Sequence, residues 1–157
     1  MKLKVRGHAP DMVVLRNAHP PHFGVEIECW TLDRPTQLSA LRGALRTAVV
    51  GIPAAHLSDH VTMSENIVFV ATELTSNALK HGAPPAIVRL SRSDTHLVLD
   101  VADHDPSTEP EYAAHRPAGT GGLGLRLVVR MATDLGWYRA GTTKHVWAGF
   151  SLAHRTS

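Results

Sequence analysis

The chain has 157 residues, enough for one domain with a hydrophobic core and too few for two ordinary domains. Hydrophobic residues make up 43% and charged residues 19%, which excludes a wholly disordered chain. The net charge of +2 comes from intermixed basic and acidic residues, so a nucleic-acid partner is not expected. No run of eighteen apolar residues is present, so a membrane-spanning helix is not expected either. Because the N-terminus also lacks the apolar stretch of a secretory signal, we expect a cytoplasmic protein.

The first 22 residues contain three of the ten prolines and show no sustained periodicity. We predict a flexible arm over residues 1–22, ahead of one domain over residues 23–155, although Met12 to Leu15 could add an edge strand. From Val25 to Leu32 apolar and polar residues alternate, which predicts a half-buried strand. Cys29 lies in that strand; as the single cysteine it has no disulfide partner, and we expect a buried thiol.

Two helices are predicted next. Thr36 is a candidate cap for a helix whose leucines and valine recur at helical spacing until Gly51. Ser58 opens a longer helix that runs to about His81 and is stopped by Gly82.

The second half of the chain is predicted to be mainly strands. Strands are expected over residues 86–90 and 97–102, and a third helix ends near Leu135-Gly136. A closing hairpin follows over residues 137–139 and 145–152. The order β-α-α-β-β-loop-α-β-β predicts an α+β two-layer sandwich, with a mixed, mostly antiparallel sheet and helices on one face.

The predicted long helix carries four polar residues on one flank of its apolar stripe, namely Asn66, Glu73, Asn77 and Lys80. An asparagine oxygen suits Mg²⁺, and a glutamate one turn earlier could orient or deprotonate a hydroxyl group. A lysine can meet a phosphate as a point charge. A solvated helix face with no task is the alternative that this helix alone leaves open.

Two further segments could bind a ligand. Asp103, at the end of a predicted strand, could accept a hydrogen bond from an exocyclic amine or could simply serve as a turn residue. The segment Gly119-Thr-Gly-Gly-Leu-Gly-Leu leads into the third helix, where free backbone amides favour a phosphate, unless the glycines act only as a hinge. A loop of about sixteen residues separates the two segments, a length that is usually functional.

In this order, the three segments resemble the boxes of the GHKL ATPase superfamily. Glu73-Leu-Thr-Ser-Asn77-Ala-Leu-Lys-His81-Gly is similar to the N box, Asp103 to the G1 aspartate, and the Gly119–Leu125 stretch to the G2 loop. The resemblance implies the Bergerat ATP-binding fold, with an ATP lid at about residues 104–118. The small size and the closing hairpin resemble the stand-alone anti-sigma-factor serine/threonine kinases.

The resemblance also implies roles for individual residues. Glu73 would be the catalytic base, and Asn77 would hold Mg²⁺. Asp103 would bind the adenine amino group. The residues implied near the ATP phosphates are Lys80, His81, Gly119, Thr120, Gly121, Gly122, Leu123, Gly124 and Leu125.

The implied function is a regulator that uses ATP and Mg²⁺ to phosphorylate a serine of an antagonist protein and that sequesters a sigma factor. The G1 box departs from its usual Asp-x-Gly-x-Gly pattern, because here it is Asp103-His-Asp-Pro. An alternative is therefore a catalytically weak or inactive nucleotide-binding module that regulates transcription by protein contact. Relatives of this class often dimerise, so a homodimer is expected.

Overall fold

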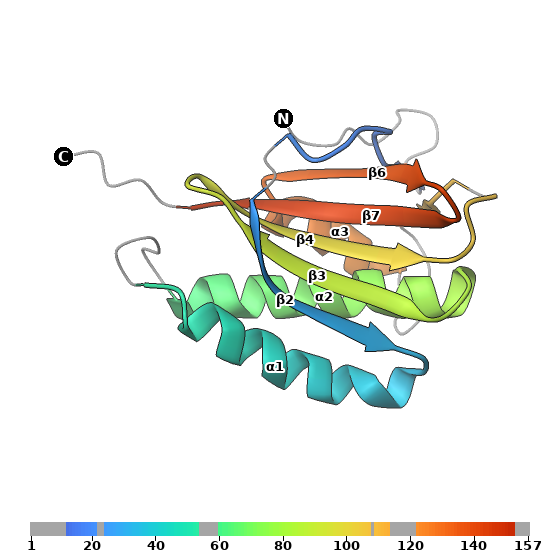
Figure 1. Ribbon diagram of the computed structural model, residues 1–157. Helices are drawn as coiled ribbons and strands as arrows, with labels where there is room; N and C mark the ends of the chain where they lie inside the picture. The colour runs from blue at the N-terminus through green and yellow to red at the C-terminus, as the bar shows by residue number, and fades with distance from the viewer. Residues whose placement is uncertain (1–11, 22–23, 54–59, 108, 114–121, 153–157) are drawn as a thin grey trace.

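A computed structural model describes residues 12–21, 24–53, 60–107, 109–113 and 122–152. In these ranges a five-stranded sheet, in the order β2-β3-β4-β7-β6, is covered on one face by α1, α2 and α3 (Figure 1). The sheet strands are β2 (Val25–Leu32), β3 (Ala86–Arg92), β4 (His96–Asp103), β6 (Asp134–Ala140) and β7 (Thr143–Ser151). The helices are α1 (Leu38–Val50), α2 (His60–His81) and α3 (Gly122–Met131).

This architecture confirms the predicted α+β two-layer sandwich. All four pairings among the five strands are antiparallel, and an isolated parallel bridge joins Asn17 to Trp137 at the outer edge of β6. None of the described helices has the length and hydropathy that crossing a bilayer requires.

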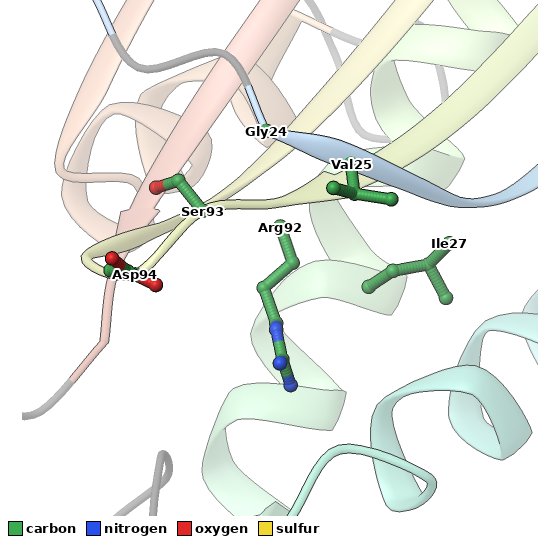
Figure 2. A pocket seen from close by; sticks show the side chains of 6 residues that line it. All are labelled: Gly24, Val25, Ile27, Arg92, Ser93 and Asp94. Carbon is green, nitrogen blue, oxygen red and sulfur yellow. The ribbon is translucent and has the colours of Figure 1, made fainter.

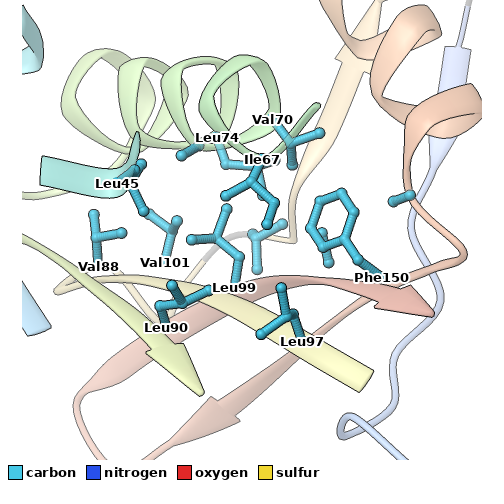
Figure 3. Close-up of a cluster of buried hydrophobic side chains, with 14 of the residues drawn as sticks. Leu45, Ile67, Val70, Leu74, Val88, Leu90, Leu97, Leu99, Val101 and Phe150 are labelled. Carbon is cyan, nitrogen blue, oxygen red and sulfur yellow. The ribbon is translucent and has the colours of Figure 1, made fainter. Parts of the chain in front are cut away.

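The core lies between the helices and the sheet. Figure 3 shows α2 presenting Ile67, Val70 and Leu74 to the row formed by Leu97, Leu99 and Val101 of β4. Each of these side chains is at most 2% exposed. Because residues two apart on a strand share a face, the same row continues along β4 to Asp103. Asp103 therefore lies at the end of β4 on the face that the helices cover.

Two element boundaries differ from the prediction. A single 3-10 turn, η1 (Pro35–Gln37), precedes α1, and the side-chain oxygen of Gln37 accepts the amides of Asp33 and Arg34 at 2.6 and 3.2 Å. Gln37, rather than Thr36, therefore satisfies the backbone at this turn.

The third helix ends at Met131, before the predicted end, and residues 134–140 form β6. Gly136, expected to stop the helix, instead pairs with Trp147 across the β6–β7 ladder. A Cβ at Gly136 would lie 2.6 Å from the indole ring, so the glycine makes room for the tryptophan.

The N-terminal segment is attached to the domain where it is described. β1 (Met12–Val14) pairs antiparallel with β5 (Glu111–Ala113), inside the segment expected to be a plain loop. Beyond β1, the Trp137 amide donates to the Arg16 carbonyl, and the Ala18 amide donates to the Trp137 carbonyl, both at 2.9 Å. Residues 16–18 thus contact the outer edge of β6 at Trp137, whereas residues 1–11 lie outside the described ranges.

The opposite edge of the sheet is β2, and no strand in the described ranges pairs with its outer side. Most of β2 is exposed, and so is Cys29. The prediction that this thiol is buried is therefore wrong. Cys29 points to the face of the sheet that carries no helices, and the side chains of an edge strand stay exposed on that face.

That helix-free face carries a polar cluster at the β4, β6 and β7 strands. The Tyr138 hydroxyl donates to one carboxylate oxygen of Asp100 at 2.9 Å, and the His145 ring lies 2.7 Å from the other. Tyr138 stacks on His145 and, on its other side, on His19, with ring centroids 4.5 and 4.2 Å apart. The cluster gives the N-terminal segment a further contact with the sheet.

Candidate functional site

The predicted site residues of α2 and β4, namely Glu73, Asn77, Lys80, His81 and Asp103, lie toward one end of the sheet. The last turns of α2, the end of β4 and the start of β7 meet there, at the right of Figure 1. Residues from three separate stretches of sequence are thereby brought to the same end of the molecule.

Asn77 is 4% exposed, and its side-chain nitrogen lies in the interior without a hydrogen-bond partner in the described structure. A buried amide without a partner costs free energy, and a ligand can supply the missing partner. Rotation of the amide by 180° would present its oxygen to the same space, which fits the oxygen ligation that Mg²⁺ prefers. Its burial and its missing partner make Asn77 the candidate protein ligand. In the described ranges no three acidic, histidine or cysteine side chains gather as a metal site.

Glu73 lies one turn before Asn77 and is half-buried. Burial raises the pKa of this carboxyl above its usual 4.5, and the positive charge of Lys80 partly offsets the rise. A carboxylate with a raised pKa is a stronger proton acceptor. Lys80 and His81 are both exposed in the last turn of α2, the place the sequence predicted for contacts to phosphates.

Asp103 ends β4 and is 3% exposed. One of its carboxylate oxygens accepts the backbone amide of Asp105 at 2.8 Å, and the other lies 3.6 Å from the ammonium of Lys144. The turn after β4, which lacks the usual glycine, is thus held by the aspartate itself.

Gly82 is required by the close approach of α2 to this carboxylate. A Cβ at Gly82 would lie 2.3 Å from an oxygen of Asp103, closer than any side chain allows. The Gly82 amide also donates to the Ala78 carbonyl at 3.0 Å, which ends the helix. The glycine therefore lets the helix end and the aspartate lie side by side.

The glycine-rich segment is described in part. Gly119, Thr120 and Gly121 lie outside the described ranges, as do residues 114–118 of the expected lid. Gly122, Leu123, Gly124 and Leu125 form the first turn of α3, so a helix does begin in the glycine-rich segment as expected.

Two hollows lie elsewhere. Figure 2 shows the residues around one of about 550 Å³, between the start of β2 and the turn that joins β3 to β4, at the opposite end of the sheet from Asp103. The other, of about 260 Å³, lies between β2 and α1 and includes Trp30 and Leu41. Neither contains a residue that the sequence predicted for the site.

Lys144 lies at the same end of the sheet, beside Asp103, and the sequence analysis did not single it out. It belongs to the alternating row of β7 that includes Val146, Ala148 and Phe150, which all face the helices. A lysine at the start of an otherwise apolar row is a pattern that could have identified it.

The profile of the histidine kinase-like ATPase domain matches residues 32–150, and the chain belongs to this family. The match includes α2, the end of β4 and the start of β7, so the site lies within the family domain.

Among solved structures, the fold is similar to the crystal structure of the RsbU and RsbW domains of Rv1364c from Mycobacterium tuberculosis. The TM-score is 0.57 at 15% sequence identity, and the similarity covers 82% of this chain and 34% of that one. The chain thus spans about a third of that structure, and the likeness concerns the fold. No curated protein sequence matches this chain.

Proposed function

We propose that the protein is a cytoplasmic regulator that binds ATP with Mg²⁺, phosphorylates a serine of a small antagonist protein and sequesters a sigma factor. The observation that carries the proposal is the pairing on α2 of a half-buried carboxylate with a raised pKa and, one turn later, a buried amide without a partner. A solvated helix face would need neither. The family of the chain supports ATP as the ligand.

The residues divide the work of phosphoryl transfer. Asn77 would hold Mg²⁺, which neutralises phosphate charge when bound. Asp103 would accept a hydrogen bond from the adenine amino group. Lys80, His81 and the backbone amides of residues 119–125 would lie along the phosphates.

Glu73 would accept the proton of the attacking serine. The serine oxygen forms a bond to the γ-phosphorus while the bond from that phosphorus to the β–γ bridging oxygen breaks. The serine proton passes to the Glu73 carboxylate, and ADP leaves. The products are phosphoserine and ADP.

A second candidate is a nucleotide-binding module that regulates by contact and has little or no catalysis. The observation that favours it is the turn after Asp103. There the carboxylate accepts the Asp105 amide, and a second carboxylate, that of Asp105, follows near the end of β4. An additional negative charge beside the nucleotide would weaken the binding of a triphosphate. In either form we propose a homodimer, as in many relatives of this class.

The two candidates are separated by Glu73→Ala, with Glu65→Ala as the control. Glu65 lies on the same helix but is exposed and pairs with Arg46 at 3.4 Å on the surface. With a cognate antagonist and saturating Mg-ATP, the kinase predicts transfer of labelled phosphate by wild type and by Glu65→Ala, and none by Glu73→Ala.

A contact regulator predicts the opposite pattern in cells, where Glu73→Ala would keep its effect on transcription. Absence of transfer by wild type at saturating Mg-ATP would contradict the kinase.

A further inference from the structure

Lys144 and Asp103 are direct neighbours across two strands. The β4–β7 ladder pairs them, and both side chains belong to the rows that face the helices. The Lys144 ammonium lies 3.6 Å from the Asp103 carboxylate, and the two side chains are only 6% and 5% exposed. The site end of the sheet therefore carries a buried donor beside a buried acceptor.

A charge at this buried position is costly for the fold. The rest of the Lys144 row is apolar, and a valine would continue it at lower cost, because burying an ammonium and a carboxylate requires removing both from water. A well-packed apolar pair is often as stable as a buried ion pair or more so. A buried ammonium beside a buried carboxylate can therefore make polar contacts with a ligand at this end of the sheet as well as with each other.

The chemistry of the pair matches one edge of adenine. That edge presents an amino group, which donates hydrogen bonds, next to the ring nitrogen N1, which accepts one. A carboxylate only accepts and an ammonium only donates, so Asp103 suits the amino group and Lys144 suits N1.

We propose that Lys144 is a second base-reading residue, which donates a hydrogen bond to N1 of the adenine while Asp103 accepts from the 6-amino group. This inference rests on the proposed function, since it requires ATP at this end of the sheet. It adds a specificity determinant that acts on the base and not on the phosphates.

The test compares two nucleotides with two proteins by calorimetry on the full chain. The nucleotides are Mg-ATP and Mg-1-deaza-ATP, in which a carbon replaces N1. The proteins are wild type and Lys144→Met, which keeps the length of the side chain without its charge. Wild type should bind ATP about tenfold or more tightly than 1-deaza-ATP, as expected for a hydrogen bond from a charged group. Lys144→Met should bind both nucleotides equally.

Three outcomes overturn the role of Lys144. One is equal binding of the two nucleotides by wild type, a comparison that needs no variant and stands even if Lys144→Met fails to fold. Another is a loss of affinity in Lys144→Met by the same factor for both nucleotides, which would show that Lys144 only holds Asp103 in place. The last is tighter binding by wild type of inosine triphosphate, whose 6-oxo group accepts where adenine donates.

Failure of the proposed function gives a different result. Wild type would then bind neither ATP nor 1-deaza-ATP, with no measurable heat from either. That outcome removes the nucleotide site itself and the role of Lys144 with it.

Discussion

Glu73 combines a chemical advantage with a cost to stability. Its carboxyl is half-buried on α2, and burial raises its pKa, with Lys80 opposing the rise. A pKa that is higher in the folded than in the unfolded chain means that the folded state binds the proton more tightly. The stabilisation is complete below the unfolded pKa and is lost as the pH rises through the folded pKa. At neutral pH, the charged Glu73 therefore destabilises the fold.

Because the charged Glu73 carboxylate destabilises the fold at neutral pH, Glu73→Gln gives a prediction. Glutamine is neutral and has nearly the same shape. At pH 7 the variant should unfold at a higher urea concentration than wild type, and the difference should vanish as the pH falls below the usual glutamate pKa of 4.5. Phosphoryl transfer should be lost in the same variant. Urea unfolding at several pH values measures the effect, with Glu65→Gln as the exposed control. Lower stability of Glu73→Gln at pH 7 would contradict it.

Thr75 gives a second prediction at this scale. The side chain is fully buried on α2, and its hydroxyl has no hydrogen-bond partner in the described structure. Because valine has the same shape without the polar atom, Thr75→Val should stabilise the protein by about 1 kcal/mol. Thr72→Val is the matched control, since the Thr72 hydroxyl donates to the Val68 carbonyl at 2.7 Å and its loss should bring no gain. Chemical denaturation of the two variants measures the change in the free energy of unfolding. Equal changes in Thr75→Val and Thr72→Val would contradict the prediction.

At the scale of elements, periodicity predicted the helices and the sheet strands, because their cores are formed by regular rows such as Ile67, Val70 and Leu74. The β1–β5 pairing was not predicted. Both strands are three residues long, which is too short for an alternating pattern, and their pairing depends on residues about 100 positions apart. The N-terminal contacts with β6 are backbone hydrogen bonds, which leave no pattern in the side chains.

Trp147 of β7 contacts both β6 and the N-terminal segment. Its ring is fully buried against Gly136, and its indole nitrogen donates to the Ala18 carbonyl at 2.7 Å. Trp147→Phe removes that donor and leaves a small void, so it should cost roughly 1–3 kcal/mol. It should also speed hydrogen exchange at the Ala18 amide, which donates to Trp137.

The control for Trp147 is Arg16→Ala. Arg16 pairs with Asp134 at 2.9 Å, but its side chain is 42% exposed, so its loss should cost about 0.5 kcal/mol or less. Unchanged exchange at Ala18 in Trp147→Phe would mean that the indole does not hold the segment.

For the whole molecule, ligand binding should appear as stability. A ligand that binds only the folded state at 100 times its dissociation constant adds about 2.7 kcal/mol to the free energy of unfolding. Mg-ATP should raise the free energy of unfolding of the wild type. It should raise that of Asn77→Ala much less, because this variant lacks the candidate metal ligand. Thermal unfolding with and without nucleotide measures it, and an unchanged transition in wild type would remove the basis for an ATP site.

The sequence predicted which segments carry the candidate site, but not the contacts between their side chains. Glu73 and Asn77 follow from a helical flank, and Asp103 from the end of a strand. The contact between Asp103 and Lys144 depends on the register of two strands about 40 residues apart, which the local pattern does not encode. For the same reason, the need for glycine at position 82 is visible only when the helix end and the strand end are seen together.

The two edges of the sheet differ in a way that sets the stoichiometry of any association through strands. In the part of the chain that the structure describes, residues 16–18 occupy the border beside β6, whereas β2 keeps a row of unpaired backbone groups. A second copy that paired its own β2 with this one would cover the open edge of both sheets at once. A third copy would then have to pair with β6, which would require displacing residues 16–18 from Trp137.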